Sequence, residues 1–136
     1  MNVIVCVDNN MGVAFNNRRQ SRDRCLNEKI LLKISGKLKV EAYSESFFPS
    51  DRISIVDDVL KETGSGEWCF SEKRSLKGSK DKIEKLMICR WNRDYPSDVH
   101  LDINLNEWQL LSTEEFAGIS HEKITMEVWK NKKIFE

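Results

Sequence analysis

Two polar segments, far apart in the chain, carry residue types that can bind an anion or move a proton. The first is NNRRQSRDR, residues 16–24, with four arginines, one aspartate and no apolar side chain; we call it the arginine segment. The second is SHEK, residues 120–123. Arginine guanidinium groups match the oxygens of phosphates and carboxylates, and histidine titrates near neutral pH. These types suit an anion receptor or a general acid–base site.

The candidate site residues come from these two segments and from RWNRDYP, residues 90–96. The candidate catalytic residues are Asp23, His121 and Glu122. The candidate anion-binding residues are Arg18, Arg19, Gln20, Ser21, Arg24, Ser120, Lys123, Trp91 and Arg93. Each of these residues could instead have a purely structural role. The arginines could be solvated or paired with nearby carboxylates, and Asp23 could interact with the helix dipole. His121 could lie at the surface, and Trp91 and Tyr95 could pack at a strand end.

The overall composition disfavours several functional classes. The 136 residues include 22 basic and 22 acidic side chains and are 40% hydrophobic, which fits one globular domain, residues 1–136. Because the charge is balanced, nucleic acid is not an expected partner. No apolar run approaches the roughly 20 residues that a membrane helix requires, and VIVCV is too short for a signal-peptide core. We therefore expect a cytoplasmic protein without a membrane partner.

The cysteines and histidines do not form a metal-binding pattern. Four cysteines, Cys6, Cys25, Cys69 and Cys89, are widely separated, and none belongs to a CxxC pair. All but Cys25 lie in strand-like apolar runs, which predicts reduced thiols packed in the core. With two histidines in the whole chain, a histidine-rich metal site is excluded. We expect no bound metal.

The apolar runs predict the elements that position the arginine segment. NVIVCVD, residues 2–8, is the near-continuous apolar run of a buried parallel strand. After the segment, Leu26, Ile30 and Ile34 recur every four residues and predict a helix. Ser21 is expected to cap that helix, with Asp23 in its first turn and Gly36 at its end.

The rest of the chain predicts mainly strands. Strands are expected in KLKVEAY, RISIVD, EWCFSE, EKLMICRW, DVHLDI, EWQLLS and KITMEVWK, short helices in SESFF and DDVLKETG, and a charged loop in KRSLKGSKDK. Alternation of strands and helices comes first, and a strand-rich end follows it. This order predicts an α/β fold.

Several of these strings resemble dihydrofolate reductase. KIEKLMICRWNRDYPSDVHLDINLNEWQLLSTEEF and KITMEVWK are similar to the family's closing segment, and NVIVCVDNNMGVAFNNR to its first strand and the mobile loop over its active site. The resemblance covers most of the chain. It implies a mixed, mostly parallel central sheet flanked by helices, with an antiparallel C-terminal strand pair. It also implies that FNNRRQSRDR lies close to FAGISHEK.

The chain departs from this family at the positions that serve folate and cofactor. The family's carboxylate in the first helix would fall near Leu26, where Asp23 and Glu28 only flank it. The turn that grips the cofactor phosphates is replaced by VEAYSES, and the paired glycines beside the pyrophosphate by CFSE, Cys69 to Glu72. A glutamate there repels phosphate, and side chains block a close approach. The resemblance therefore implies a degenerate active site, with no cofactor expected.

Three functions remain open from the sequence. The first is a divergent dihydrofolate reductase-like protein that binds a small anionic ligand or a protein partner. The second is an NADPH-dependent reductase in which the arginine segment has taken over phosphate binding. The third is an RNA-binding or RNA-processing protein, which the balanced charge disfavours. The strings FNxRRQSxDR, RWNRxYP and SHEKIT also resemble a small bacterial family whose members are sometimes labelled ribonuclease Z. That activity requires a histidine-rich two-metal motif, which is absent here.

Overall fold

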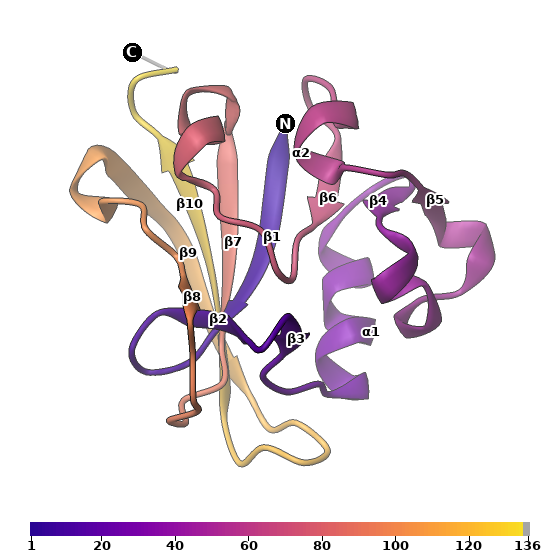
Figure 1. Ribbon diagram of the computed structural model, residues 1–136, viewed down its shortest axis with the longest axis vertical. Helices are drawn as coiled ribbons and strands as arrows, with labels where there is room; N and C mark the ends of the chain where they lie inside the picture. Colours follow the sequence, from indigo (N-terminus) through magenta and orange to yellow (C-terminus); the bar gives the residue numbers. More distant parts are fainter. Residues whose placement is uncertain (135–136) are drawn as a thin grey trace.

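A seven-stranded mixed sheet forms the centre of the computed structural model, which describes residues 1–134 (Figure 1). The strand order is β5-β4-β6-β1-β7-β10-β9. The strands are β1 (Asn2–Val7), β4 (Leu38–Val40), β5 (Ile53–Ile55), β6 (Trp68–Phe70), β7 (Lys85–Arg90), β9 (Trp108–Phe116) and β10 (Ile124–Asn131). Pairing is parallel from β5 to β7, whereas β10 runs antiparallel to β7 and to β9. The predicted mixed sheet with an antiparallel C-terminal pair is confirmed.

A second, three-stranded sheet contains the start of the arginine segment. It consists of β3 (Arg18–Arg19), β2 (Gly12–Phe15) and β8 (Val99–His100), in the order β3-β2-β8. Asn16 and Asn17 have φ angles of 51° and 59°, which is the backbone of a two-residue hairpin turn that asparagine tolerates. This hairpin was not predicted from the sequence. The strand predicted in DVHLDI is longer than the two residues of β8.

Helix α1 (Arg24–Lys33) follows the arginine segment directly. Its N-cap is Asp23, whose side chain accepts from the Cys25 N–H at 3.0 Å. The prediction that Ser21 is the cap was therefore wrong. Leu26 and Ile30 are buried as predicted, because they form the apolar face of α1 that packs on the sheet.

The other helical elements are short. They are α2 (Val59–Glu62) and four 3-10 turns, η1 (Ala42–Phe47), η2 (Ser50–Arg52), η3 (Lys77–Lys82) and η4 (Leu105–Glu107). The strand expected in KLKVEAY stops at Val40, and the chain turns into η1 at Ala42. Within residues 1–134, none of the helices has both the length and the apolar character needed to cross a membrane.

Strand β1 separates two apolar clusters, because alternate residues of a strand point to opposite faces. Val3, Val5 and Val7 belong to the cluster on one face of the sheet. Ile4 belongs to the other cluster, together with Leu26 and Ile30 of α1. Figure 1 shows α1 beside β4 and β5, and the β9–β10 pair at the opposite edge of the sheet. The carboxyl end of β1 therefore leads into the region between α1 and the C-terminal strands.

The thiols are expected to differ sharply in reactivity. All four cysteines are free, with Cys69 and Cys89 buried. Burial raises the pKa of Cys69 to about 12, and a hydrogen bond with Cys89 together with burial raises the pKa of Cys6 well above its ordinary value. Iodoacetamide at pH 8 should therefore alkylate the partly exposed Cys25 first, because the thiolate is the reactive form. Peptide mass spectrometry will check this order, and Cys69 labelling as fast as Cys25 would contradict it.

Candidate functional site

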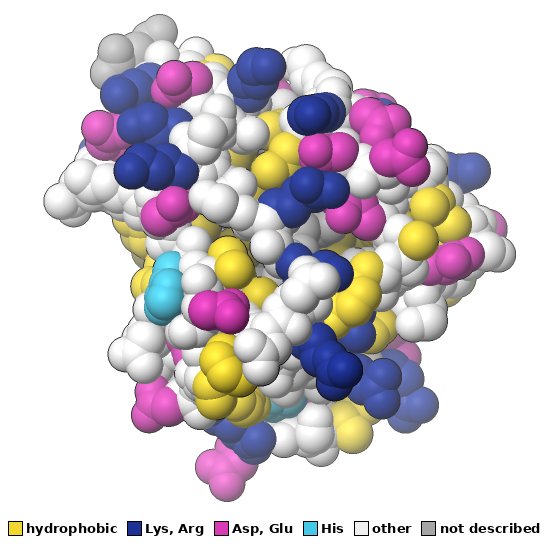
Figure 2. All heavy atoms as spheres, viewed as in Figure 1, with side chains coloured by type: hydrophobic (Ala, Val, Ile, Leu, Met, Phe, Trp, Pro, Cys, Tyr) yellow, Lys and Arg dark blue, Asp and Glu magenta, His cyan; other side chains and the backbone are white. Residues whose placement is uncertain are grey.

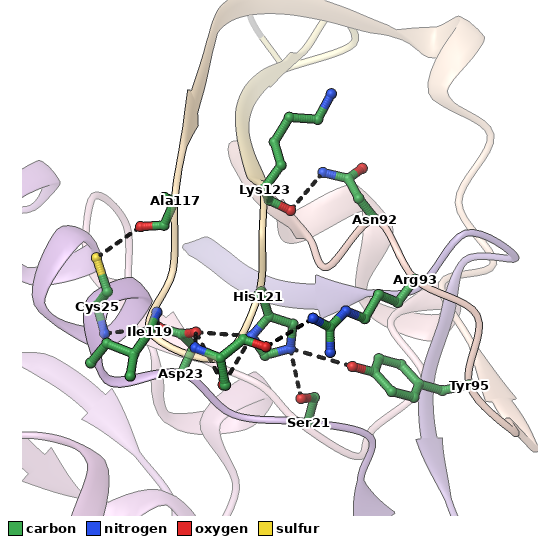
Figure 3. Close-up of polar contacts among 11 residues, drawn as sticks. Ser21, Asp23, Cys25, Asn92, Arg93, Tyr95, Ala117, Ile119, His121 and Lys123 are labelled. Atoms are coloured by element: carbon green, nitrogen blue, oxygen red, sulfur yellow. Dashed lines mark hydrogen bonds and ion pairs between the residues drawn. The ribbon is translucent and has the colours of Figure 1, made fainter.

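The arginine segment and the SHEK segment meet at His121 (Figure 3). The His121 side chain is 1% exposed and its Nδ1 lies 2.9 Å from Oδ2 of Asp23, which is fully buried. On the other side of the ring, Nε2 lies 2.9 Å from the Ser21 hydroxyl and 3.3 Å from the Tyr95 hydroxyl. The proximity that the resemblance implied is therefore present, and the expected surface alternative for His121 is wrong.

Asp23 is an ionised acceptor that ties the SHEK segment to the start of α1. It accepts backbone N–H groups from Cys25, Ile119 and Ser120 at 3.0–3.1 Å, and the Ser120 hydroxyl at 3.3 Å. Burial opposes ionisation, but the hydrogen bonds from His121 and these backbone groups outweigh it and hold the pKa of Asp23 well below its ordinary value.

The hydrogen bond to Asp23 determines which nitrogen of His121 carries the proton. Because an ionised carboxylate can only accept, Nδ1 must donate to Asp23. In the neutral ring, Nε2 then offers its lone pair to the hydroxyls of Ser21 and Tyr95. A neutral histidine in this tautomer can act as a general base toward a hydroxyl.

Trp91 shields the histidine. Its ring stacks on His121 with centroids 4.5 Å apart and an interplanar angle of 25°. Only 3% of Trp91 is exposed, so the packing alternative holds and the prediction that it stacks on a ligand was wrong.

A second carboxylate, Asp8 directly after β1, holds the middle of the arginine segment through Gln20. Asp8 accepts backbone N–H groups from Asn10, Gly12 and Tyr95 at 2.8–3.1 Å, and the Gln20 amide at 3.2 Å. Gln20 also donates to a backbone carbonyl, that of Pro96. The Gln20 amide therefore has a structural role, contrary to the anion-binding prediction. Asp8 itself was missed, although an aspartate closing a buried strand was its signal in the sequence.

The Arg19 side chain is also engaged, in an ion pair with another residue of the protein. It forms a two-point ion pair with Glu72, with Nε–Oε2 at 2.7 Å and Nη2–Oε1 at 2.9 Å. Its guanidinium lies 4.1 Å and 4.2 Å from the ring centroids of Tyr43 and Phe47. Burial opposes the charge of Arg19, but the hydrogen bond to Glu72 raises its pKa. The Ser44 hydroxyl donates to the same carboxylate at 2.6 Å. Arg19 is therefore part of the wall of the site, which the sequence did not predict.

Three arginines remain without a partner. Within residues 1–134, the side chains of Arg18, Arg22 and Arg24 make no hydrogen bond or ion pair. They line three neighbouring hollows. Arg18 borders the hollow of about 430 Å³, Arg18 and Arg22 both border that of about 460 Å³, and Arg22 and Arg24 border that of about 620 Å³. Figure 2 shows Lys and Arg side chains gathered where Figure 1 places β3 and the start of α1. Arg22 was missed as a candidate, although it belongs to the same segment.

The remaining candidates lie elsewhere. Glu122 and Lys123 border a separate hollow of about 480 Å³ with Arg93. The hydrogen-bond partners of the His121 ring are Asp23, Ser21, Tyr95 and Ser120, so the candidate catalytic role of Glu122 is not supported by a contact with His121. Lys123 pairs with Glu115 at 3.6 Å. Arg93 donates to the Ser120 carbonyl at 2.9 Å instead of pairing with a neighbouring aspartate.

The described residues contain no metal-binding cluster. Among residues 1–134, no three side chains of histidine, cysteine, aspartate or glutamate lie together in a way that could hold a metal ion. The chemistry of a two-metal nuclease requires such clusters. The label ribonuclease Z has no support in this geometry.

Comparison with known proteins identifies the fold. No protein-family model and no curated protein sequence matches the chain. Among solved structures, the chain is similar to a dihydrofolate reductase from Enterococcus faecalis complexed with NADP(H) and RAB-propyl. The TM-score is 0.68 over 94% of each chain, at 11% sequence identity. The protein therefore has a dihydrofolate reductase-like fold.

Proposed function

We propose that this protein is a dihydrofolate reductase-like domain that has lost folate reduction and NADPH binding, and that binds a small anionic ligand at the arginine segment. One observation carries the proposal. Arg18, Arg22 and Arg24 are unpaired within the described residues and line neighbouring hollows. Guanidinium groups bind phosphate and carboxylate through paired hydrogen bonds, so three unpaired guanidinium groups beside neighbouring hollows favour an anion.

The dimensions and charge of this region favour a small ligand. The three hollows range from about 430 to about 620 Å³, which is within the usual range of small-molecule pockets. The formal net charge of zero disfavours a wide basic surface for RNA. A protein partner carrying a phosphate or carboxylate uses the same chemistry and is the alternative occupant. The free thiols fit the cytoplasmic location that we propose.

The turn after β6 does not fit the pyrophosphate of NADPH, the cofactor that the fold implies. Ser71 and Glu72 follow β6, in place of glycines that would let the backbone approach the cofactor. The Glu72 side chain is 8% exposed and is held by Arg19 and Ser44. A cofactor phosphate would have to displace Arg19 from this carboxylate. This arrangement supports loss of the cofactor, and an NADPH-dependent reductase remains the alternative.

The proposal predicts selective loss of anion binding. Wild-type protein should bind inorganic pyrophosphate or citrate in calorimetric titrations at low salt. The double variant Arg18→Gln/Arg22→Gln should bind about 100-fold more weakly, because two charge-assisted hydrogen-bonding groups are lost. The matched control Lys37→Gln/Lys77→Gln removes the same charge from exposed positions outside the cleft and should keep wild-type affinity.

Two results would overturn the proposal. An equal loss of anion affinity in both double variants would show a general charge effect. If wild-type protein binds neither pyrophosphate nor citrate, the arginine segment is not an anion receptor. NADPH is titrated in parallel, and we expect no binding at millimolar concentration. Saturable micromolar binding of NADPH would instead support the reductase.

A further inference from the structure

We propose that Ser21, His121 and Asp23 form a nucleophile–base–carboxylate triad that hydrolyses carboxylic esters of small anionic acids. The preference for anionic acids rests on the proposed function, whereas the triad rests on geometry alone. The Ser21 hydroxyl lies 2.9 Å from His121 Nε2, and His121 Nδ1 lies 2.9 Å from Asp23 Oδ2. Such triads are recognised by these two contacts and by the role of each residue, on unrelated folds.

The electrostatic state of the three residues suits these roles. Asp23 is ionised and accepts the Nδ1–H of His121, so the lone pair on Nε2 faces the Ser21 hydroxyl. A buried carboxylate behind the ring also stabilises the imidazolium that forms when Nε2 takes a proton. Asp23 therefore positions His121, and His121 is the base for Ser21.

The three residues differ in solvent exposure as the reaction requires, with the nucleophile partly exposed and the other two buried. Ser21 is partly exposed and lines the hollow of about 460 Å³ together with Arg18, Arg22, Tyr43 and Ser120. His121 and Asp23 are buried behind it. A substrate in this hollow can reach the nucleophile, while bulk water is kept from the hydrogen bond between Asp23 and His121. The arginines of the same hollow are the groups that would select an anionic acid.

Several contacts hold the triad rigidly. Asp23 is fixed by three backbone N–H groups and caps α1. Trp91 stacks on the imidazole and restricts its rotation. Because the ring and the carboxylate are both fixed, the Ser21 contact is preorganised, as a catalytic hydrogen bond must be.

The reaction balances with water as the second reactant. The Ser21 oxygen attacks the ester carbonyl carbon while Nε2 of His121 takes the hydroxyl proton. The carbon–oxygen bond to the alcohol then breaks, and His121 returns the proton to the leaving oxygen. Water attacks the acyl-serine, again giving its proton to His121, which returns it to Ser21. The products are a carboxylic acid and an alcohol, and nothing is oxidised or reduced.

A substitution at Tyr95 distinguishes Ser21 from Tyr95 as the reactive hydroxyl. Its hydroxyl also faces Nε2, at a longer distance of 3.3 Å. If Ser21 is the nucleophile, Tyr95→Phe removes a competing hydrogen bond and keeps the reaction. If the tyrosine oxygen were the reactive group, the same change would abolish it.

The test uses a neutral probe, so that it does not depend on anion binding. Diisopropyl fluorophosphate should add one diisopropylphosphoryl group to Ser21 of the full-length protein, located by peptide mass spectrometry. Ser21→Ala should remove this label, His121→Gln should slow it by about 100-fold or more, and Tyr95→Phe should keep it. Ser112→Ala, at an exposed position on β9, is the control and should label like wild type. Circular dichroism will verify that each variant is folded.

Each outcome separates the triad from the anion receptor. No label on wild-type Ser21, or an unchanged rate in folded His121→Gln, overturns the triad. If Ser21 is labelled but Arg18→Gln/Arg22→Gln binds pyrophosphate as tightly as wild type, the triad is supported and the proposed function is overturned. For the anionic preference, Arg18→Gln/Arg22→Gln should reduce hydrolysis of mono-4-nitrophenyl succinate about 10-fold more than that of 4-nitrophenyl acetate. Equal reductions would overturn that preference.

Discussion

Replacing Asp23 with asparagine is expected to lower the free energy of unfolding by about 3 kcal/mol, the cost of leaving buried hydrogen-bond donors without their ionised acceptor. The asparagine side chain has nearly the same shape, but one of its two carboxyl-side oxygens becomes an NH₂ group. An NH₂ group in place of Oδ2 cannot accept from His121 or from the Ser120 N–H, and one in place of Oδ1 cannot accept from the N–H groups of Cys25 and Ile119. At least one buried donor therefore loses its acceptor.

Urea denaturation followed by tryptophan fluorescence will measure this effect. Asp81→Asn is the matched control, since Asp81 is exposed in η3, and it should change stability by less than about 0.5 kcal/mol. If Asp23→Asn were equally mild, Asp23 would not be the central acceptor that we describe.

The effect of Asp23 should also depend on pH in a defined direction. The pKa of Asp23 is lowered in the folded protein, so its ionised form stabilises the fold fully above the ordinary aspartate pKa of about 4. Below that pH the unfolded chain takes up a proton that the folded protein does not, and the stabilisation decreases. The difference between wild type and Asp23→Asn should therefore be about 1 kcal/mol smaller at pH 3 than at pH 7. An equal difference at both values would contradict the lowered pKa.

Replacing Gly118 with alanine is expected to destabilise the protein by about 2 kcal/mol, because the added methyl group has no space. A Cβ at this position would lie 2.8 Å from Cδ1 of Ile124 and 2.9 Å from Cγ of Asp23, and still closer to Oδ2 of Asp23. That oxygen accepts from His121. The backbone around Gly118 must therefore move, and the Asp23–His121 contact should weaken with it.

Denaturation in urea and labelling of Ser21 will report the two consequences separately. Gly78→Ala is the control, since a Cβ at Gly78 meets nothing within 4 Å, and we expect a change below about 0.5 kcal/mol. If Gly118→Ala has wild-type stability, the close approach between residue 118 and Asp23 is not present in solution. Lower stability with an unchanged labelling rate would show that the triad tolerates movement of this segment.

The two carboxylates that organise the site, Asp8 and Asp23, explain why its geometry was only partly predictable. Both stand next to regular elements that the sequence predicted, the first strand and the first helix. What each carboxylate contacts depends on segments that are remote in the chain, such as Tyr95 for Asp8 and Ile119 for Asp23. Local patterns contain no information on such partners. The pairing of Arg19 with Glu72 joins residues 53 positions apart and was unpredictable for the same reason.

The sequence by itself determined the elements whose signals are local. The buried first strand, α1 with its apolar stripe, the short helix α2 and the C-terminal strands were all predicted, because side-chain periodicity acts within a few residues. Only the tertiary structure decided which arginines are free and which oxygen faces His121, whose partner Asp23 is 98 residues away. Arg18 and Arg19 are the same residue type at adjacent positions, and only the folded chain brings a carboxylate to one of them and leaves the other unpaired.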